Sequence, residues 1–183
     1  LVMKGPFFHG HPRCSASTSA TRNAAAAATT TQASTPGNSV RLLTAQPASM
    51  VAYVKRVSLV RRDGAWTLDL QRLLDAVTPA TRMLLVNAPN NPTGWTLART
   101  EQQAMLDHCR RTGTWIVADE VYERVYFREG ARCAPSFLDI ASSDDRLVVV
   151  HSFSKSFLMT GWRLGWMVAP EPLVAALGKL IEF

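Results

Sequence analysis

Lys155 stands where a lysine could form a covalent bond to a carbonyl compound. It follows a short apolar run at residues 147–151 and lies between Phe153 and Phe157. A lysine in a partly dry, walled position has a lowered pKa, and the neutral amine is the form that attacks a carbonyl carbon. Because most lysines are exposed, the residue alone does not define a site, and its neighbours in the sequence must support the interpretation.

Two carboxylates and a phenol follow a second apolar run. Asp119 and Glu120 come directly after residues 115–118, and Tyr122 stands three residues beyond Asp119. Acids at strand ends often serve only as loop caps. The alternative is a carboxylate that pairs with a cationic ring nitrogen. If the chain turns into a helix here, the Tyr122 hydroxyl lies near the same ligand.

An amide and a guanidinium complete the candidate set. Residues 87–94 form a turn dense in Pro, Asn and Gly, in which Asn91 can offer a fixed amide donor. Arg163 lies among the apolar residues of segment 162–166, where we expect it to be buried and therefore to need an anion. Phosphate matches the forked donors of an arginine.

Alternating strands and helices must position these residues. Apolar patterning predicts strands at 51–60, 82–87, 115–119, 147–151 and 163–169, and helices at 69–77, at 100–112 and from Pro172 to Phe183. For the second helix we expect Thr100 as the N-cap, Gln103 at the capping-box position and Gly113 beyond the end. This order predicts an α/β fold with a parallel sheet. Ligands of such sheets lie beyond the carboxyl ends of the strands, here after Val86, Ala118 and Val150.

Three segments carry a resemblance to a known family. Residues 152–165, Ser-Phe-Ser-Lys-Ser-Phe-Leu-Met-Thr-Gly-Trp-Arg-Leu-Gly, are similar to the lysine-attachment signature of the class I/II aminotransferases. The turn 91–94, Asn-Pro-Thr-Gly, and the segment 119–122, Asp-Glu-Val-Tyr, resemble two further motifs in the same order. Residues 51–183 therefore resemble the central fragment of the large domain of a fold-type-I pyridoxal-phosphate enzyme, with a mostly parallel sheet and flanking helices.

The resemblance implies a cofactor, pyridoxal 5′-phosphate, and roles for six residues. Lys155 would hold the cofactor as a Schiff base and, once released, move a proton between the substrate's Cα and the cofactor's C4′. Asp119 would keep the ring nitrogen protonated, so that the ring accepts electrons. Asn91 and Tyr122 would bond the ring's phenolic oxygen.

The same resemblance assigns the phosphate and the substrates. Ser152 and Arg163 would hold the cofactor's phosphate. The substrates implied are a small-molecule amino acid and a 2-oxo acid, and the full-length family form is expected to be a homodimer. Two alternatives stay open: a lyase or decarboxylase of the same fold, and an inactive, non-enzymatic remnant.

The resemblance leaves parts of the family pattern unmatched. The arginine that binds the substrate's α-carboxylate belongs to a C-terminal portion that the sequence does not include. We therefore expect a truncated chain, partial folding with exposed apolar faces and a very low turnover in isolation.

Residues 1–49 differ in composition from the rest. Ala, Ser, Thr, Gly and Pro account for 30 of the first 50 residues, too little apolar surface to offset the entropy of ordering. We expect this segment to be mostly disordered through about residue 48, with a short helix at most through Ala24–Ala28, and the domain to span 50–183. A transit peptide and an aberrant start are both compatible with this composition, and the Leu at position 1 favours the second.

Charge and cysteine content exclude several classes of function. The net charge of +6 divides into +8 for residues 1–62 and −2 for the remainder, without the basic cluster that nucleic-acid binding needs. No apolar run is long enough to span a membrane. The scattered cysteines, Cys14, Cys109 and Cys133, give neither a disulfide framework nor a metal site, and His9 and His11 lack a third ligand. We expect no metal, no nucleic acid, no membrane and a reducing compartment, the cytoplasm.

Overall fold

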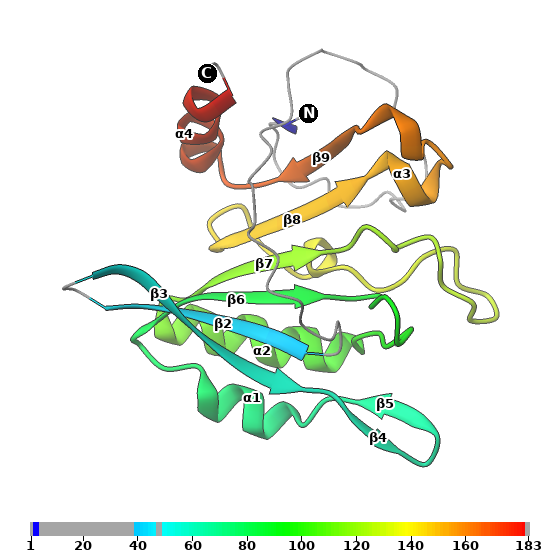
Figure 1. The fold of residues 1–183 in the computed structure, drawn as a ribbon, viewed down its shortest axis with the longest axis horizontal. Coiled ribbons are helices and arrows are strands. Elements are labelled where there is room, and N and C mark those ends of the chain that lie inside the picture. The colour runs from blue at the N-terminus through cyan, green and yellow to red at the C-terminus, as the bar shows by residue number, and fades with distance from the viewer. Residues whose placement is uncertain (1, 4–38, 47–48, 182–183) are drawn as a thin grey trace.

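Three short apolar runs form the centre of the fold as parallel strands. They are β6 (Thr81–Asn87), β7 (Trp115–Asp119) and β8 (Leu147–Ser152), which pair in that order. The structure is a computed structural model that describes residues 2–3, 39–46 and 49–181, and within these ranges the central sheet has seven strands (Figure 1). The predicted α/β architecture is confirmed, with a parallel sheet at its centre.

The strands on either side of this centre run in the opposite direction. β9 (Gly165–Val168) is antiparallel to β8 and pairs on its other side with β1 (Val2–Met3). β2 (Ser39–Gln46) is antiparallel to β6 and forms a hairpin with β3 (Ser49–Ser58). Residues 1–48 were expected to be mostly disordered, but residues 39–46 of this range form β2, which pairs with β3 along its length and with β6 over residues 41–44. The alanine run lies outside the described residues.

Two helices pack against this sheet, and both begin near the predicted positions. α1 (Leu70–Ala76) is capped by Asp69, whose carboxylate accepts a hydrogen bond from the Arg72 N–H at 3.0 Å. α2 (Arg99–Thr112) ends at Gly113, which has the left-handed φ of 71° common at helix C-termini.

The predicted N-cap of α2, Thr100, and the predicted capping-box residue, Gln103, are wrong. Ala98 is the N-cap, and its N–H donates to the Glu101 carboxylate at 2.8 Å. A carboxylate in the first turn both accepts this bond and interacts favourably with the helix dipole. Leu97, directly before the cap, is buried in the hydrophobic core.

The remaining elements are short or lie near the C-terminus. A two-stranded hairpin, β4 (Val60–Arg62) with β5 (Ala65–Thr67), turns at Asp63 and Gly64, which both have positive φ. This hairpin was not predicted. Four short or terminal helices complete the list: η1 (Phe137–Asp139), α3 (Phe153–Ser156), η2 (Thr160–Trp162) and α4 (Glu171–Ile181).

The hydrophobic core joins the helices to the central strands. Leu73 of α1 and Met105 of α2 are fully buried, as are Leu84 of β6 and Val149 of β8. Burying each such side chain contributes about 1.5–3 kcal/mol, so the central strands are held firmly beneath the loops that follow them. Within the described ranges, no helix has the length and apolar character needed to cross a membrane.

Candidate active site

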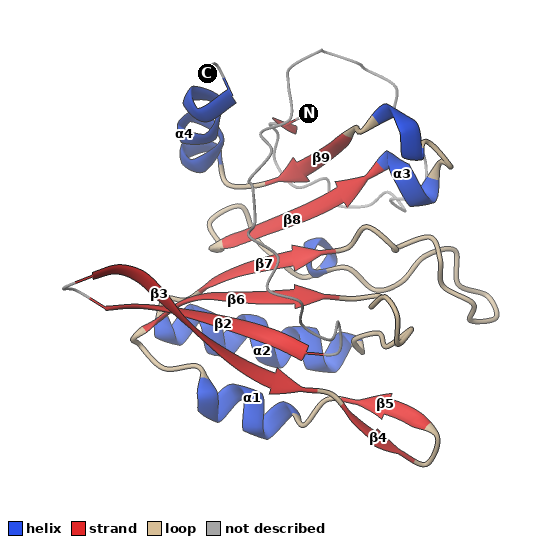
Figure 2. Cartoon of the chain, in the orientation of Figure 1, coloured by secondary structure: helices blue, strands red, loops and turns tan. Residues whose placement is uncertain are grey.

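The carboxyl ends of the three parallel strands meet at one edge of the sheet. β6 ends at Asn87, β7 at Asp119 and β8 at Ser152, with Asn87 and Asp119 directly opposite in register. Figure 2 shows that the loops after β6 and β7 and the helix after β8 leave from this same edge. The prediction that candidate residues gather here is confirmed for the segments that carry them.

Asp119 is a half-buried carboxylate held by neutral donors. Asn87 donates its amide to Oδ2 at 2.8 Å, and the Val121 N–H approaches Oδ1 at 3.4 Å. Burial raises the pKa of Asp119, while these two donors oppose that shift. No Lys, Arg or His among the described residues forms an ion pair with it. The carboxylate therefore favours a cationic partner that the described part of the chain does not supply.

The turn after β6 is braced by side-chain amides. Asn90 is buried; it donates to Asn87 Oδ1 at 3.1 Å and accepts from the Thr93 hydroxyl at 2.7 Å. Sequence reasoning named Asn91 in this turn and missed Asn87, which orients Asp119. The signal available was its position as the last residue of a strand whose neighbour ends in the acid.

Asn91, Tyr122 and Lys155 are brought together from three different segments. The Asn91 amide donates to the Tyr122 hydroxyl at 3.1 Å, and Lys155 Nζ lies 5.7 Å from the centre of the Tyr122 ring. Tyr122 lies in a turn, with the Val125 N–H bonded to its carbonyl at 2.8 Å, and not in a helix.

Ser152 and Lys155 lie at the junction of β8 and α3, since Ser152 ends the strand and caps the helix that carries Lys155. Ser152 caps α3 by accepting from the Ser154 N–H at 3.1 Å, and its hydroxyl donates to the Leu164 carbonyl at 3.4 Å. Lys155 follows within the single turn of α3 and is exposed.

The expected walled position of Lys155 is wrong. Phe153 and Phe157 pack on each other and on Trp166, with ring centroids 5.3 Å apart for the phenylalanines and 4.7 Å for Phe153 and Trp166. Their rings are used in packing against β9, so they do not enclose the amine.

Arg163 is exposed, and the expected burial among its apolar neighbours is wrong. Trp162 and Leu164 are themselves 70% and 48% exposed, so they provide no cover. The backbone of Arg163 adopts a left-handed φ of 52°, and its guanidinium donates to the Thr160 carbonyl at 3.3 Å. Because Ser152 bonds the adjacent Leu164 carbonyl, Arg163 is still held close to the start of α3.

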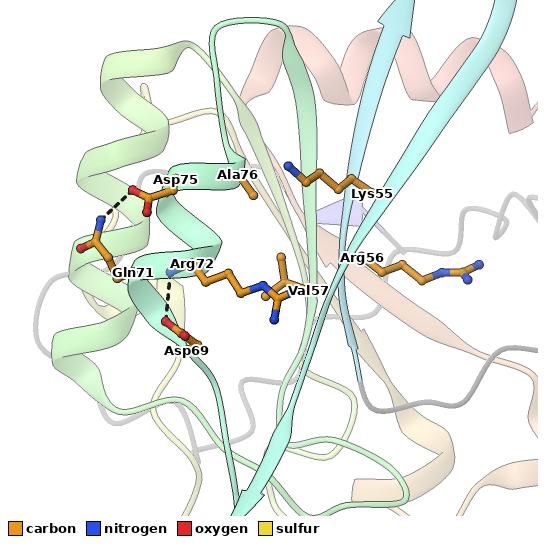
Figure 3. A pocket seen from close by; sticks show the side chains of 8 residues that line it. All are labelled: Lys55, Arg56, Val57, Asp69, Gln71, Arg72, Asp75 and Ala76. Carbon is orange, nitrogen blue, oxygen red and sulfur yellow. Dashed lines mark hydrogen bonds between the residues drawn. The ribbon is translucent and has the colours of Figure 1, made fainter.

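A surface hollow of about 570 Å³ lies elsewhere, between β3 and α1 (Figure 3). Its lining includes Lys55, Arg72 and Asp75, and none of the six predicted site residues borders it. Two of its acids are already engaged: Asp69 caps α1, and Asp75 accepts from Gln71 at 2.7 Å. This hollow is therefore separate from the sheet edge that carries the predicted site residues.

Known aminotransferases are similar to this chain, in sequence or in structure, over about two thirds of its length. An arginine–pyruvate transaminase from Pseudomonas aeruginosa is 36% identical over 121 residues, which make up 66% of this chain and 30% of that protein. The solved structure of an N-succinyldiaminopimelate aminotransferase from Mycobacterium tuberculosis aligns with a TM-score of 0.59 and 35% identity, covering 68% of this chain and 32% of the other. An aspartate aminotransferase from Thermotoga maritima gives a TM-score of 0.58 and 30% identity, covering 63% and 30%.

The chain spans about a third of the length of the curated relatives it matches. The family model described as aminotransferase class I and II matches residues 16–183. This match starts well upstream of residue 50, where the resemblance was expected to begin. Because this family model covers most of the sequence, the chain belongs to the class I and II aminotransferase family.

Proposed function

We propose that this chain carries the cofactor-binding core of a pyridoxal-phosphate-dependent aminotransferase, which moves an amino group between an amino acid and a 2-oxo acid. The observation that carries the proposal is the half-buried Asp119 carboxylate, which has a raised pKa and no cationic partner among the described residues, at the same sheet edge as Lys155. A protonated pyridine nitrogen is the partner that such a carboxylate would stabilise.

The donor set fits this cofactor from one end of the ring to the other. The Asp119 carboxylate can accept from the ring nitrogen, and the bonded pair Asn91 and Tyr122 can donate to the ring oxygen. The exposed Arg163 guanidinium can donate to the phosphate, and the Ser152 hydroxyl can do so by giving up its long 3.4 Å bond to the Leu164 carbonyl. When bound, pyridoxal phosphate supplies an aldehyde carbon and a ring that accepts electrons from the substrate's α-carbon.

The protein's own part is binding, orientation and proton transfer. Lys155 Nζ provides the amine for covalent attachment, and the same nitrogen can take a proton from the substrate's α-carbon and return it. Asp119 holds the proton on the ring nitrogen by its negative charge. Asn87, through its bond to Oδ2, fixes the plane in which Asp119 does so.

The relatives' names include arginine–pyruvate, aspartate and N-succinyldiaminopimelate aminotransferases, so we propose only an amino acid and a 2-oxo acid as substrates.

We further propose a homodimeric full-length form. The exposed apolar side chains of Leu158 and Trp162, next to the site, support such an interface. The scattered cysteines favour the cytoplasm. Sedimentation of the full-length form would test the dimer.

Covalent labelling tests the proposed function. The chain would be incubated with pyridoxal phosphate, reduced with borohydride and mapped by mass spectrometry. We expect the label on Lys155, its loss in Lys155→Ala, and no change in Lys55→Ala, a matched control because Lys55 lies on the distant strand β3. A label spread evenly over the lysines, or one that persists in Lys155→Ala, would contradict the proposal. A screen of amino donors with the unreduced, pyridoxal-phosphate-loaded full-length form then identifies the substrate.

A further inference from the structure

The turn that carries Tyr122 is attached to the segment that carries Lys155 by the two residues after Tyr122. Glu123 and Arg124 both reach across to residues 151–166, while Tyr122 itself lies beneath the Lys155 amine. Neither residue was singled out by the sequence motifs.

Glu123 makes the first contact, to the last part of β8. Its Oε2 lies 3.4 Å from His151 Nδ1, and the two side chains are only 13% and 4% exposed. This separation is long for a hydrogen bond, and the two groups attract each other as an ion pair when the imidazole is protonated. The imidazole is itself fixed, because it stacks on Trp166 at a centroid distance of 4.9 Å and an interplanar angle of 16°.

Arg124 makes the second contact, to the residue after α3. Its guanidinium carbon lies 5.4 Å above the Phe157 ring, within the range of a cation–π interaction. Its Nε is 3.7 Å from Glu123 Oε1, so the Glu123 carboxylate lies between Arg124 and His151. The contacts therefore bracket Lys155, because His151 precedes it by four residues and Phe157 follows it by two.

We propose that Glu123 and Arg124 are positioning residues that hold the Tyr122 hydroxyl at a set place relative to Lys155. The proposal deepens the proposed function and rests on it, because Tyr122 is there a donor to the cofactor. Neither residue touches the cofactor in this role. Glu123 and Arg124 act through Tyr122, whose backbone carbonyl accepts from the Val125 N–H within the same turn.

Hydrogen exchange of the cofactor-free chain tests whether these contacts hold the turn. We expect Glu123→Ala and Arg124→Ala to speed exchange of the Val125 amide about two- to tenfold, since each removes a contact of modest strength. Arg124→Lys keeps a cation over Phe157 and should restore slow exchange. Glu129→Ala, an exposed acid in the same loop, is the matched control and should change nothing. Unchanged exchange in Glu123→Ala and Arg124→Ala would overturn the proposal.

A double-mutant cycle on cofactor affinity tests whether the effect passes through Tyr122. In the chain with Tyr122, we expect Glu123→Ala to weaken pyridoxal-phosphate binding several-fold, measured by visible absorbance. In the Tyr122→Phe background the same change should cost less than about twofold, because coupled residues are not additive. An equal loss in both backgrounds would show that Glu123 only supports the fold and would refute the positioning role.

The two proposals fail in different ways. If the unchanged chain takes up no cofactor and Lys155 carries no label, the proposed function fails, and the exchange measurement alone decides whether Glu123 and Arg124 hold the turn. If Lys155 is labelled but the cycle is additive, the proposed function stands and the positioning role does not.

Discussion

Asp119 and Asp145 lie at opposite ends of neighbouring strands, and their surroundings differ in kind. Asp145, just before β8, accepts two hydrogen bonds of 2.7 Å from the Arg110 guanidinium and one of 2.7 Å from the Ser142 N–H. The bond from Arg110 lowers the pKa of Asp145. Asp119, at the carboxyl end of β7, has neutral donors only and a pKa raised by burial.

Under the proposed function, this contrast separates an end of the sheet that stabilises the fold from an end that binds a ligand. At the amino ends, the charge of Asp145 is neutralised by Arg110, which also reaches Asp107 at 2.8 Å. At the carboxyl ends, Asp119 has no cation among the described residues, and Lys155 and Arg163 are exposed. A carboxylate left without a counterion costs stability, so its retention fits a site that a cationic ligand completes.

The largest expected effect comes from removing the charge of Asp119. Asp119→Asn keeps the shape and a hydrogen-bonding oxygen but loses the partner of a cationic ring nitrogen. Losing one partner of a buried charge pair costs about 2–5 kcal/mol, so cofactor affinity should fall at least about thirtyfold. Titration with pyridoxal phosphate, followed by visible absorbance, measures this. The control is Asp144→Asn, which changes an exposed acid near the other end of the sheet. Equal cofactor affinities for the unchanged chain, Asp119→Asn and Asp144→Asn would show that the Asp119 charge does not contribute to cofactor binding.

The reverse experiment removes the charge at the stabilising end. Asp145→Asn leaves the Arg110 guanidinium with only the more exposed Asp107 carboxylate, and hydrogen bonds to charged groups contribute about 1.5–3 kcal/mol. We expect the free energy of unfolding in urea to fall by about that amount, while cofactor affinity of the folded protein stays the same. A loss of affinity comparable to that of Asp119→Asn would show that the two ends are not independent.

Gly165 tests the junction between β8 and β9, directly beside Ser152. A Cβ at this position would lie 2.7 Å from the His151 carbonyl oxygen, a backbone atom that cannot move aside cheaply. Gly165→Ala should therefore destabilise the protein by about 1–3 kcal/mol. Gly161→Ala is matched, because a Cβ there meets nothing within 4 Å. Equal unfolding midpoints for the two variants would contradict the close approach.

The sequence predicted the strand ends well because their signals are local. Short apolar runs gave β6, β7 and β8 almost to the residue, and the parallel-sheet rule then placed Asp119, Tyr122 and Lys155 at one edge. The role of Asn87 depends on cross-strand register, which a single strand does not encode. The contacts of Glu123 and Arg124 depend on how the loop after β7 folds back, so no pattern in the chain pointed to them.

The sequence misjudged burial around Lys155 and Arg163 for a different reason. Aromatic neighbours were taken as walls, but Phe153 and Phe157 pack toward Trp166, and Trp162 remains 70% exposed. Composition near a residue shows which side chains are available, not the direction in which they point. Directions follow from tertiary packing, which the local pattern does not contain.

The smallest expected effect is a pH dependence of opposite sign at the two ends. The folded-state pKa of Asp119 is raised, so the folded state holds its proton longer, and stability falls as pH rises from the ordinary carboxyl range to that raised pKa. Asp119→Asn lacks this loss, so its stability relative to the unchanged chain should increase with pH over that window.

The folded-state pKa of Asp145 is lowered, so the stability that its carboxylate contributes is present above the ordinary carboxyl range and disappears as pH falls through the lowered pKa. The deficit of Asp145→Asn should therefore shrink in acid. Urea unfolding of the three chains from about pH 3 to about pH 7 measures both slopes. Slopes of the same sign would mean that Asp119 already has a counterion within the chain, and the case for a cationic ligand at this edge would lose its electrostatic basis.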